Sequence, residues 1–148
     1  MLVFMACYVW FLLFFACLFS TSLPAQTNNT FFLGHSLVNF DIPNMVDKLS
    51  TAGNQAFLFD ANIGIGANLD WHWNNPTTGQ GSQWDLALPL GGYENFIITE
   101  AVPLENHLQY SDTYRTADSL YRFANQYNPN IQYDIYETWH CIKGGIGS

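Results

Sequence analysis

A serine directly after a short apolar segment is the residue in this chain best suited to nucleophilic chemistry. Gly34-His35-Ser36-Leu37 follows the apolar residues 30–33 (TFFL). A serine in a tight turn between a strand and a helix can expose its hydroxyl, and nearby backbone N–H groups can stabilise an oxyanion. Ser36 is therefore the candidate nucleophile, although the chain has no G-x-S-x-G motif. The alternative is that Gly34 and Ser36 only form a turn.

Three further groups come directly after apolar segments and are candidates for the same site. They are Gly64-Ile65-Gly66, Thr99-Glu100 and residues 137–140 (ETWH). In open parallel sheets, ligands bind beyond the carboxyl ends of the strands, so these groups should meet at one edge. We expect the pocket there to be lined by His35, Glu100, Trp139 and His140.

No metal or cofactor is expected at this edge. The histidines His35, His72, His107 and His140 show neither an H-E-x-x-H motif nor paired cysteines at ligand spacing. His35 is interpreted as a turn residue beside the nucleophile. Trp71, Trp73 and Trp84 lie in a long loop, where they either pack against the fold or line a tryptophan-rich crevice for a ring-bearing ligand.

Hydrophobic periodicity predicts two helices. The first has Asp41 as N-cap, Pro43 in its first turn and Gly53 as its stop. Its apolar face would comprise Ile42, Met45, Val46, Leu49 and Ala52. The second helix spans residues 111–127 and ends at Asn128-Pro129. Its apolar face would comprise Tyr114, Ala117, Leu120, Tyr121 and Ala124.

Strands are predicted at residues 30–33, 55–60, 95–99 and 131–136, and a long loop at 61–92 is expected to be functional or to contain short helices. Alternation of strands and helices predicts an α/β fold with a parallel sheet. Open sheets of this kind usually have five or more strands and a closing helix. Because the sequence ends soon after the fourth strand, we expect a fragment that lacks the last strand and helix.

Several segments together resemble the SGNH/GDSL hydrolases. The resemblance is to an exported subgroup with a Gly-His-Ser-Leu first block and a Tyr-Glu-Thr-Trp-His segment, and it covers nearly all of residues 31–140. The segments that carry it are FFLGHSLVNFDIPNMVDKLSTAG, GIGANLDWHW, ENFIITEAVPLENHLQYSDTYR and NPNIQYDIYETWH.

The resemblance implies a flavodoxin-like three-layer sandwich with a central first strand and with Ser36 at the start of the following helix, attacking an ester carbonyl. The oxyanion would be held by the backbone N–H groups of Ser36 and of Gly66, with Gly64 in reserve. The substrate would be a small-molecule or carbohydrate ester.

Two positions depart from the family pattern. The third block usually offers an asparagine donor, where this chain has Thr99-Glu100-Ala101; Asn68 or Asn106 would have to replace it. The family's Asp-x-x-His pair near the C-terminus has no clear counterpart, since Glu137-x-x-His140 follows the fourth strand and is interpreted as pocket wall. The chain is therefore expected to be an esterase fragment with little activity, or a non-catalytic ligand-binding form of the fold.

Composition narrows the function further. The chain has 12 acidic and 4 basic residues, a net charge of −8. Nucleic-acid binding is not expected, because it needs a clustered basic surface. A content of 17% aromatic and 11% charged residues predicts a folded chain, and the body suits one domain.

The N-terminal segment predicts export. Residues 2–19 are uncharged and apolar, and small and polar residues follow them. We interpret residues 1–25 as a signal peptide cleaved after Ala25, and 26–148 as a partial hydrolase domain that is secreted or periplasmic. An uncleaved membrane anchor is the alternative. Removal of the signal would leave Cys141 alone, so we expect it to pair with a cysteine beyond Ser148.

Overall fold

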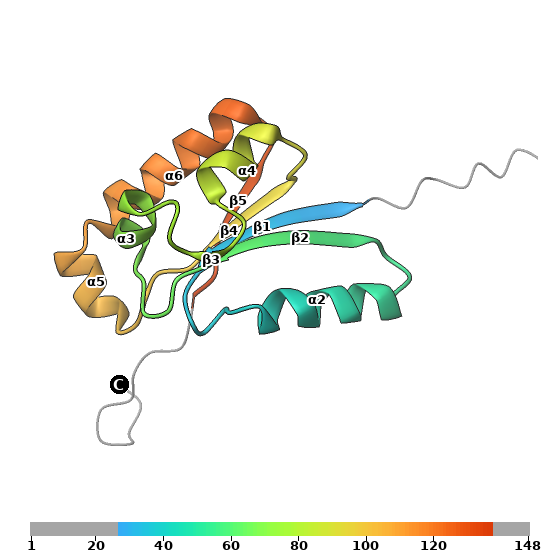
Figure 1. The fold of residues 1–148 in the computed structure, drawn as a ribbon, viewed down its shortest axis with the longest axis horizontal. Helices are drawn as coiled ribbons and strands as arrows, with labels where there is room; N and C mark the ends of the chain where they lie inside the picture. The colour runs from blue at the N-terminus through green and yellow to red at the C-terminus, as the bar shows by residue number, and fades with distance from the viewer. Residues whose placement is uncertain (1–26, 138–148) are drawn as a thin grey trace, which may run out of the picture.

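The structure is a computed structural model that describes residues 27–137. Trp139, His140 and Cys141, like the apolar N-terminal segment, lie outside the described residues. Helices and strands alternate along the chain as expected (Figure 1). In order they are β1 Asn28–Gly34, α2 Asp41–Ala52, β2 Phe57–Ile63, α3 Leu69–Asn74, β3 Gln80–Gly81, α4 Trp84–Leu90, β4 Asn95–Ile98, α5 Leu104–Tyr110, α6 Thr113–Tyr127 and β5 Gln132–Ile135.

The five strands form one sheet in the order β3-β2-β1-β4-β5. β1 is central and pairs in parallel with both β2 and β4, and β4 pairs in parallel with β5. The predicted α/β class and the central first strand are confirmed, and the order of the parallel strands is that of the flavodoxin-like sheet. The one difference is β3, a two-residue antiparallel edge strand against β2 that the sequence analysis did not predict.

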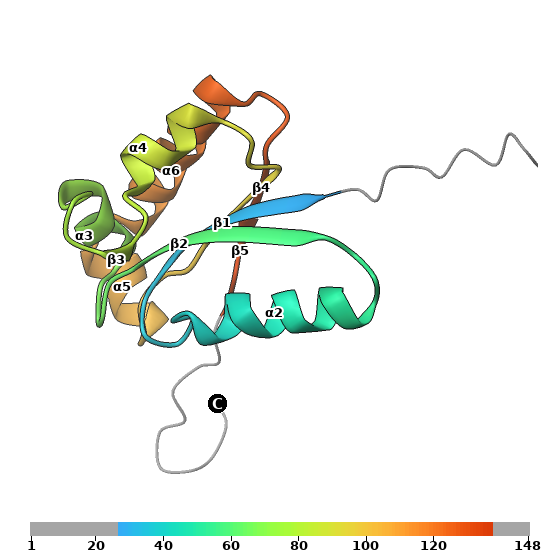
Figure 2. The ribbon, with the colours of Figure 1, turned by 45° about the vertical axis from the view of Figure 1, so that its right-hand side comes forward.

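Helices cover both faces of the sheet and make three layers. α2 lies against one face, and α3, α4, α5 and α6 gather on the other (Figures 1 and 2). Alternate strand residues feed two cores. Phe31, Leu33, Phe96 and Ile98 point into the larger core beneath α4 and α6, and Phe32 and Ile63 point toward α2.

The predicted long loop contains short elements, as one of its two interpretations required. α3, β3 and α4 lie within residues 61–92. The strand predicted at 55–60 begins later and runs longer, as β2. Asn62 explains part of this shift, because its buried side chain donates to Ser82 O at 3.1 Å and holds the loop against the strand. Such a tertiary contact has no signature in local periodicity.

The predicted cap and apolar face of α2 are partly wrong. Phe40 is the N-cap residue, makes no side-chain cap bond, and Asp41 is already the first helical residue. Met45 and Leu49 are 52% and 67% exposed. The reason is that α2 is the one helix on its face of the sheet among residues 27–137, so only one edge of its apolar stripe has a packing partner. Gly53 is the C-cap, as predicted.

The second predicted helix is α6, with its buried face rotated from the predicted one. Thr113, Thr116, Leu120 and Ala124 are buried, whereas Tyr114 is 73% exposed. The threonines are buried because each hydroxyl has a hydrogen-bond partner. Helix α5 was not predicted. It begins at Leu104 after the N-cap residue Pro103, and Glu105 in its first turn was a helix-start signal present in the sequence.

No helix among residues 27–137 has the length and apolarity that crossing a bilayer requires.

The core can be tested at Phe96, which is fully buried and contacts the rings of Phe31 and Tyr133. Phe96→Ala should lower the free energy of unfolding in urea by about 3–5 kcal/mol, because it removes a large buried side chain and leaves a cavity. Leu58→Ala, at a position on β2 that is 57% exposed, is the control and should cost less than about 1 kcal/mol. If Phe96→Ala prevents folding, Phe96→Leu provides the graded measurement; equal costs at the two positions would contradict this core.

Candidate functional site

The carboxyl ends of β1 and β4 meet at the centre of the sheet, where the strand order reverses. Leu33 is opposite Ile98, and Thr99 N–H donates to Leu33 O at 2.9 Å. The residues that follow these strands, Ser36 and Glu100, therefore lie at neighbouring strand ends. This is the position at which open α/β sheets bind their ligands.

Ser36 lies in a turn at the end of β1, not at the N-terminus of α2 as predicted. The N–H groups of Val38 and Asn39 both donate to His35 O, at 3.0 and 2.9 Å, so the chain makes one separate helical turn before α2 begins at Asp41. Asn39 ends that turn with a φ of 42°. Ser36 is exposed, and its N–H has no hydrogen-bond partner among the described residues.

The side chain of His35 holds this turn in place. It is buried, with Nε2 3.0 Å from Glu100 O and with Leu37 N–H donating to Nδ1 at 3.3 Å. These two contacts suit a neutral ring protonated on Nε2. Burial lowers the pKa of His35, against the opposing effect of its bond to Glu100. His35 is thus placed to hold the turn, and both of its nitrogens are occupied.

The two candidate glycines of the β2–α3 loop differ in what their N–H groups do. Gly64 N–H donates to Gly34 O at 2.9 Å, and a side chain at Gly64 would collide with Ala67 and Trp71. Gly66 is exposed with a φ of 71°, and its N–H has no partner among residues 27–137. Gly64 therefore has a packing role, and Gly66 retains a donor for a ligand.

The Glu100 carboxylate connects the end of β4 with the starts of α3 and α6. It is only 6% exposed. Its Oε1 accepts from Leu69 N–H at 3.1 Å and from Ala101 N–H at 2.7 Å, and its Oε2 accepts from the Thr113 hydroxyl at 2.5 Å. Glu100 was expected in the pocket, and Thr113 was not, because its bond to Glu100 joins two segments 13 residues apart.

Of the two alternatives for a third donor, only Asn68 lies in this cluster. Its Oδ1 caps α3 by accepting from Trp71 N–H at 2.7 Å, and its Nδ2 is 3.4 Å from His107 Nδ1. Asn106 is exposed on α5. His107, which is also 3.0 Å from Ser111 Oγ, joins the site through α5, the helix that the sequence analysis missed.

A second histidine, His72, is completely buried behind the same strand ends. Its Nε2 is 2.9 Å from Gly34 O, and its Nδ1 is 3.0 Å from Asn62 Oδ1. Desolvation by burial lowers the pKa of His72 to about 4, and its hydrogen bond to Gly34 only partly opposes this. A neutral ring donates to only one of these two acceptors, and donation from Nε2 to Gly34 O supports the end of β1.

Two of the loop tryptophans pack within the fold. Trp84 is buried, stacks on Trp73 with ring centroids 5.6 Å apart, and donates from Nε1 to His72 O at 3.1 Å. Trp84 also contacts Phe123 of α6 edge-on. Trp71 packs beside Gly64 and His72. The packing interpretation thus holds for Trp73 and Trp84, and these rings are unavailable to a crevice.

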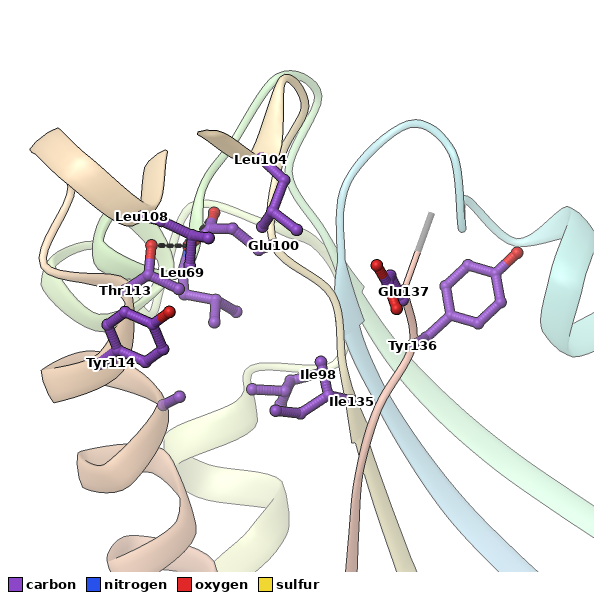
Figure 3. A pocket seen from close by; sticks show the side chains of 11 residues that line it. Leu69, Ile98, Glu100, Leu104, Leu108, Thr113, Tyr114, Ile135, Tyr136 and Glu137 are labelled. Atoms are coloured by element: carbon purple, nitrogen blue, oxygen red, sulfur yellow. Dashed lines mark hydrogen bonds between the residues drawn. The ribbon is translucent and has the colours of Figure 1, made fainter. Parts of the chain in front are cut away.

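A pocket of about 310 Å³ opens between the ends of β4 and β5 and helices α5 and α6. Figure 3 shows leucines from the helix side facing Ile98 and Ile135 from the strands, with Glu100 and Thr113 at its inner end. Of the residues predicted to line the pocket, Glu100 does so. His35 lies beneath the turn that leads to it, bonded to Glu100 O.

Among residues 27–137, no three histidine, cysteine or carboxylate side chains are grouped so that they could hold a metal ion.

Comparison with known proteins shows similarity at the level of the fold. No family model matches the chain, and no curated protein is significantly similar to it in sequence. Among solved structures, it is similar to the crystal structure of a DUF4886 family protein from Bacteroides uniformis ATCC 8492, with a TM-score of 0.59 and 14% identity. The match covers 77% of this chain and 51% of that one, so this chain spans about half the length of the solved protein.

The hydrogen bonds of Glu100 make an isosteric test possible. In Glu100→Gln, the amide oxygen can keep the Leu69 and Ala101 bonds, and the amide nitrogen can donate to Thr113 Oγ1, whose proton turns to His107 O at 2.9 Å. We expect a loss of less than about 1 kcal/mol in the free energy of unfolding. Glu100→Ala should cost roughly 2–5 kcal/mol, because it leaves buried donors without acceptors. Equal losses in both variants, measured by urea unfolding, would mean that the charge and not the hydrogen-bond pattern is what matters.

The lowered pKa of His72 predicts that the protein loses stability in acid. In the unfolded chain its pKa is 6.5, and in the folded protein it is about 4, so between these values the unfolded chain binds more protons. The free energy of unfolding should therefore be highest above pH 6.5 and fall as the pH approaches 4, by about 3 kcal/mol from this residue. Urea unfolding from pH 7 to pH 4 measures the slope. His72→Gln should flatten it, and an unchanged slope in that variant would assign the effect to other groups.

Proposed function

We propose that this chain carries the nucleophilic half of a serine esterase of the SGNH type, exported from the cytoplasm, in which Ser36 attacks the carbonyl carbon of an ester. The observation that carries the proposal is the position of Ser36: an exposed serine in a turn at the strand-order reversal, with its own N–H unpaired. The similarity to the DUF4886 family protein supports the fold and adds nothing about the reaction.

Two backbone N–H groups are available to stabilise the oxyanion. Those of Ser36 and Gly66 have no partners among the described residues, and each follows a neighbouring parallel strand. As Ser36 Oγ adds to the carbonyl, the negative charge that develops on the carbonyl oxygen needs such preorganised donors. Asn68 Nδ2, at the start of α3, is the best-placed side chain for a third donor.

The general base is the component that these residues do not supply. Serine needs an imidazole to take its proton during the attack and return it to the leaving alcohol. His35 and His72 are unsuitable, because each is buried with both nitrogens engaged and has a lowered pKa. The base is then His107 of α5, His140, or an Asp-x-x-His segment supplied from outside this sequence.

A ligand-binding domain without catalysis is the second candidate. It is favoured by the pocket beside the turn, which does not depend on a base for its formation. In that case the turn and the loop glycines would position a ligand without cleaving it.

Hydrolysis of p-nitrophenyl butyrate tests the proposal. The 148-residue chain should show faint turnover, because binding and oxyanion donors without the base give roughly 10³–10⁴ over water. Joining a C-terminal Asp-x-x-His segment should raise the rate at least about 100-fold, as a positioned base does. Ser36→Ala should abolish that gain, and Ser119→Ala, at a half-buried serine of α6, should keep it.

Two outcomes would change the assignment. A gain that survives Ser36→Ala would remove Ser36 as the nucleophile. Strong Ser36-dependent hydrolysis by the 148-residue chain alone would mean that a base is already present, and loss of that activity in His140→Ala would identify it.

A further inference from the structure

The pocket between α5, α6 and the ends of β4 and β5 has a mainly apolar wall. Six apolar side chains form most of it: Leu69, Ile98, Leu104, Leu108, Ala117 and Ile135 (Figure 3). Two residues at this pocket, Tyr114 and Ile135, are 73% and 64% exposed, which leaves apolar surface open to water. Covering such surface with an apolar ligand group is favourable.

The polar groups at the inner end of the pocket are already used. Both oxygens of Glu100 accept hydrogen bonds from Leu69, Ala101 and Thr113, and the Thr113 hydroxyl is shared between Glu100 and His107 O. A sugar at this end would have few partners for its hydroxyl groups, and buried hydroxyls without partners are costly. The other polar groups of the lining belong to Tyr114, Tyr136 and Glu137. The wall therefore favours an apolar group over a carbohydrate.

Charge and size restrict the group further. The ionisable residues of the lining other than tyrosine, Glu100 and Glu137, are both acidic, which disfavours an anionic ligand. An apolar cavity of about 150 Å³ can hold benzene, which has six carbons. A pocket of about 310 Å³ is therefore much larger than the methyl of an acetyl group requires.

The pocket is also connected to the turn that carries Ser36. Glu100 lines the pocket with its side chain and bonds to His35, the neighbour of Ser36, through its backbone oxygen at 3.0 Å. Leu69, another lining residue, begins α3 directly after the loop that contains Gly66 and Asn68. The lining is thus linked to the Ser36 turn through Glu100 and to the Gly66 loop through Leu69, while Ser36 and Gly66 are not lining residues themselves.

We infer that this pocket binds the acyl group of the substrate, and that this group is uncharged and apolar with about six carbons or more. The identification of this group as an acyl group rests on the proposed esterase function. The binding preference itself follows from the pocket and can be measured without turnover.

The binding experiment uses Ser36→Ala in the 148-residue chain, with isoleucine methyl groups observed by NMR. Methyl hexanoate should shift the methyl signals of Ile98 and Ile135 and leave Ile63, which lies in the core on the α2 side, unchanged. Methyl acetate should bind at least about tenfold more weakly, since each buried CH₂ strengthens binding by about fourfold. Equal affinities for the two esters, or no shift at Ile98 and Ile135, would overturn the inference.

Two variants locate the binding. Ala117→Phe should fill the pocket, and Leu108→Asn should place an unpaired amide in its wall, so each should weaken binding of methyl hexanoate at least about tenfold. Leu86→Asn, at a position 61% exposed on α4 and outside the lining, is the matched control and should bind normally. The Ile63 signal reports whether each variant is folded. Normal binding by folded Leu108→Asn would overturn the inference.

The chain extended with the Asp-x-x-His segment separates this inference from the esterase proposal. We expect kcat/KM to be at least about tenfold higher for p-nitrophenyl hexanoate than for the acetate, with the preference lost in Leu108→Asn. Ser36-dependent hydrolysis that favours acetate would overturn the inference and leave the esterase standing. Pocket binding of methyl hexanoate without Ser36-dependent hydrolysis would overturn the esterase alone.

Discussion

The hydrogen bonds of Glu100 are the interactions on which this edge of the molecule depends. Four separate segments converge there: the end of β4, the start of α3, the start of α6 and, through the backbone oxygen, the turn after β1. A carboxylate at 6% exposure is costly unless its lone pairs are occupied, and here three donors occupy them. The same hydrogen bonds hold the loops in place. The contacts that offset the cost of burying the charge are therefore also the contacts that order the site.

Two buried neutral histidines complete this support from the opposite side. His35 holds the Ser36 turn against Glu100, and His72 holds Gly34 at the end of β1. Both pKa values are lowered, chiefly by burial. A histidine near a candidate nucleophile could be catalytic. In His35 and His72, however, both ring nitrogens contact other groups of the protein, so these rings hold the backbone in place. Their contacts hold the backbone on both sides of Ser36, at Gly34 and at Leu37, while Ser36 itself stays exposed.

The two faces of the sheet differ in how fully they are covered, and this difference shapes the site. Four helices cover the face on which the larger core lies, and α5 with α6 stands away from the ends of β4 and β5 far enough to leave the apolar pocket. On the other face α2 packs over the smaller core, and part of its apolar stripe faces solvent. The pocket thus belongs to the well-packed side, where its walls are held by the core beneath.

Local patterns in the chain were enough to predict the α/β class, both long helices and the position of Ser36 at a strand end, because periodicity and turn residues act over a few positions. The central first strand was implied by the resemblance to the SGNH/GDSL hydrolases. Local patterns were not enough to predict the Thr113–Glu100 bond, the contacts of His35 and His72, or the packing role of Gly64. Each of these depends on segments far apart in sequence. Asp41 failed as a cap and Met45 and Leu49 failed as core residues for the same reason: a local pattern shows that a residue is suited to a cap or a core, but burial is decided by which other elements of the fold pack against it.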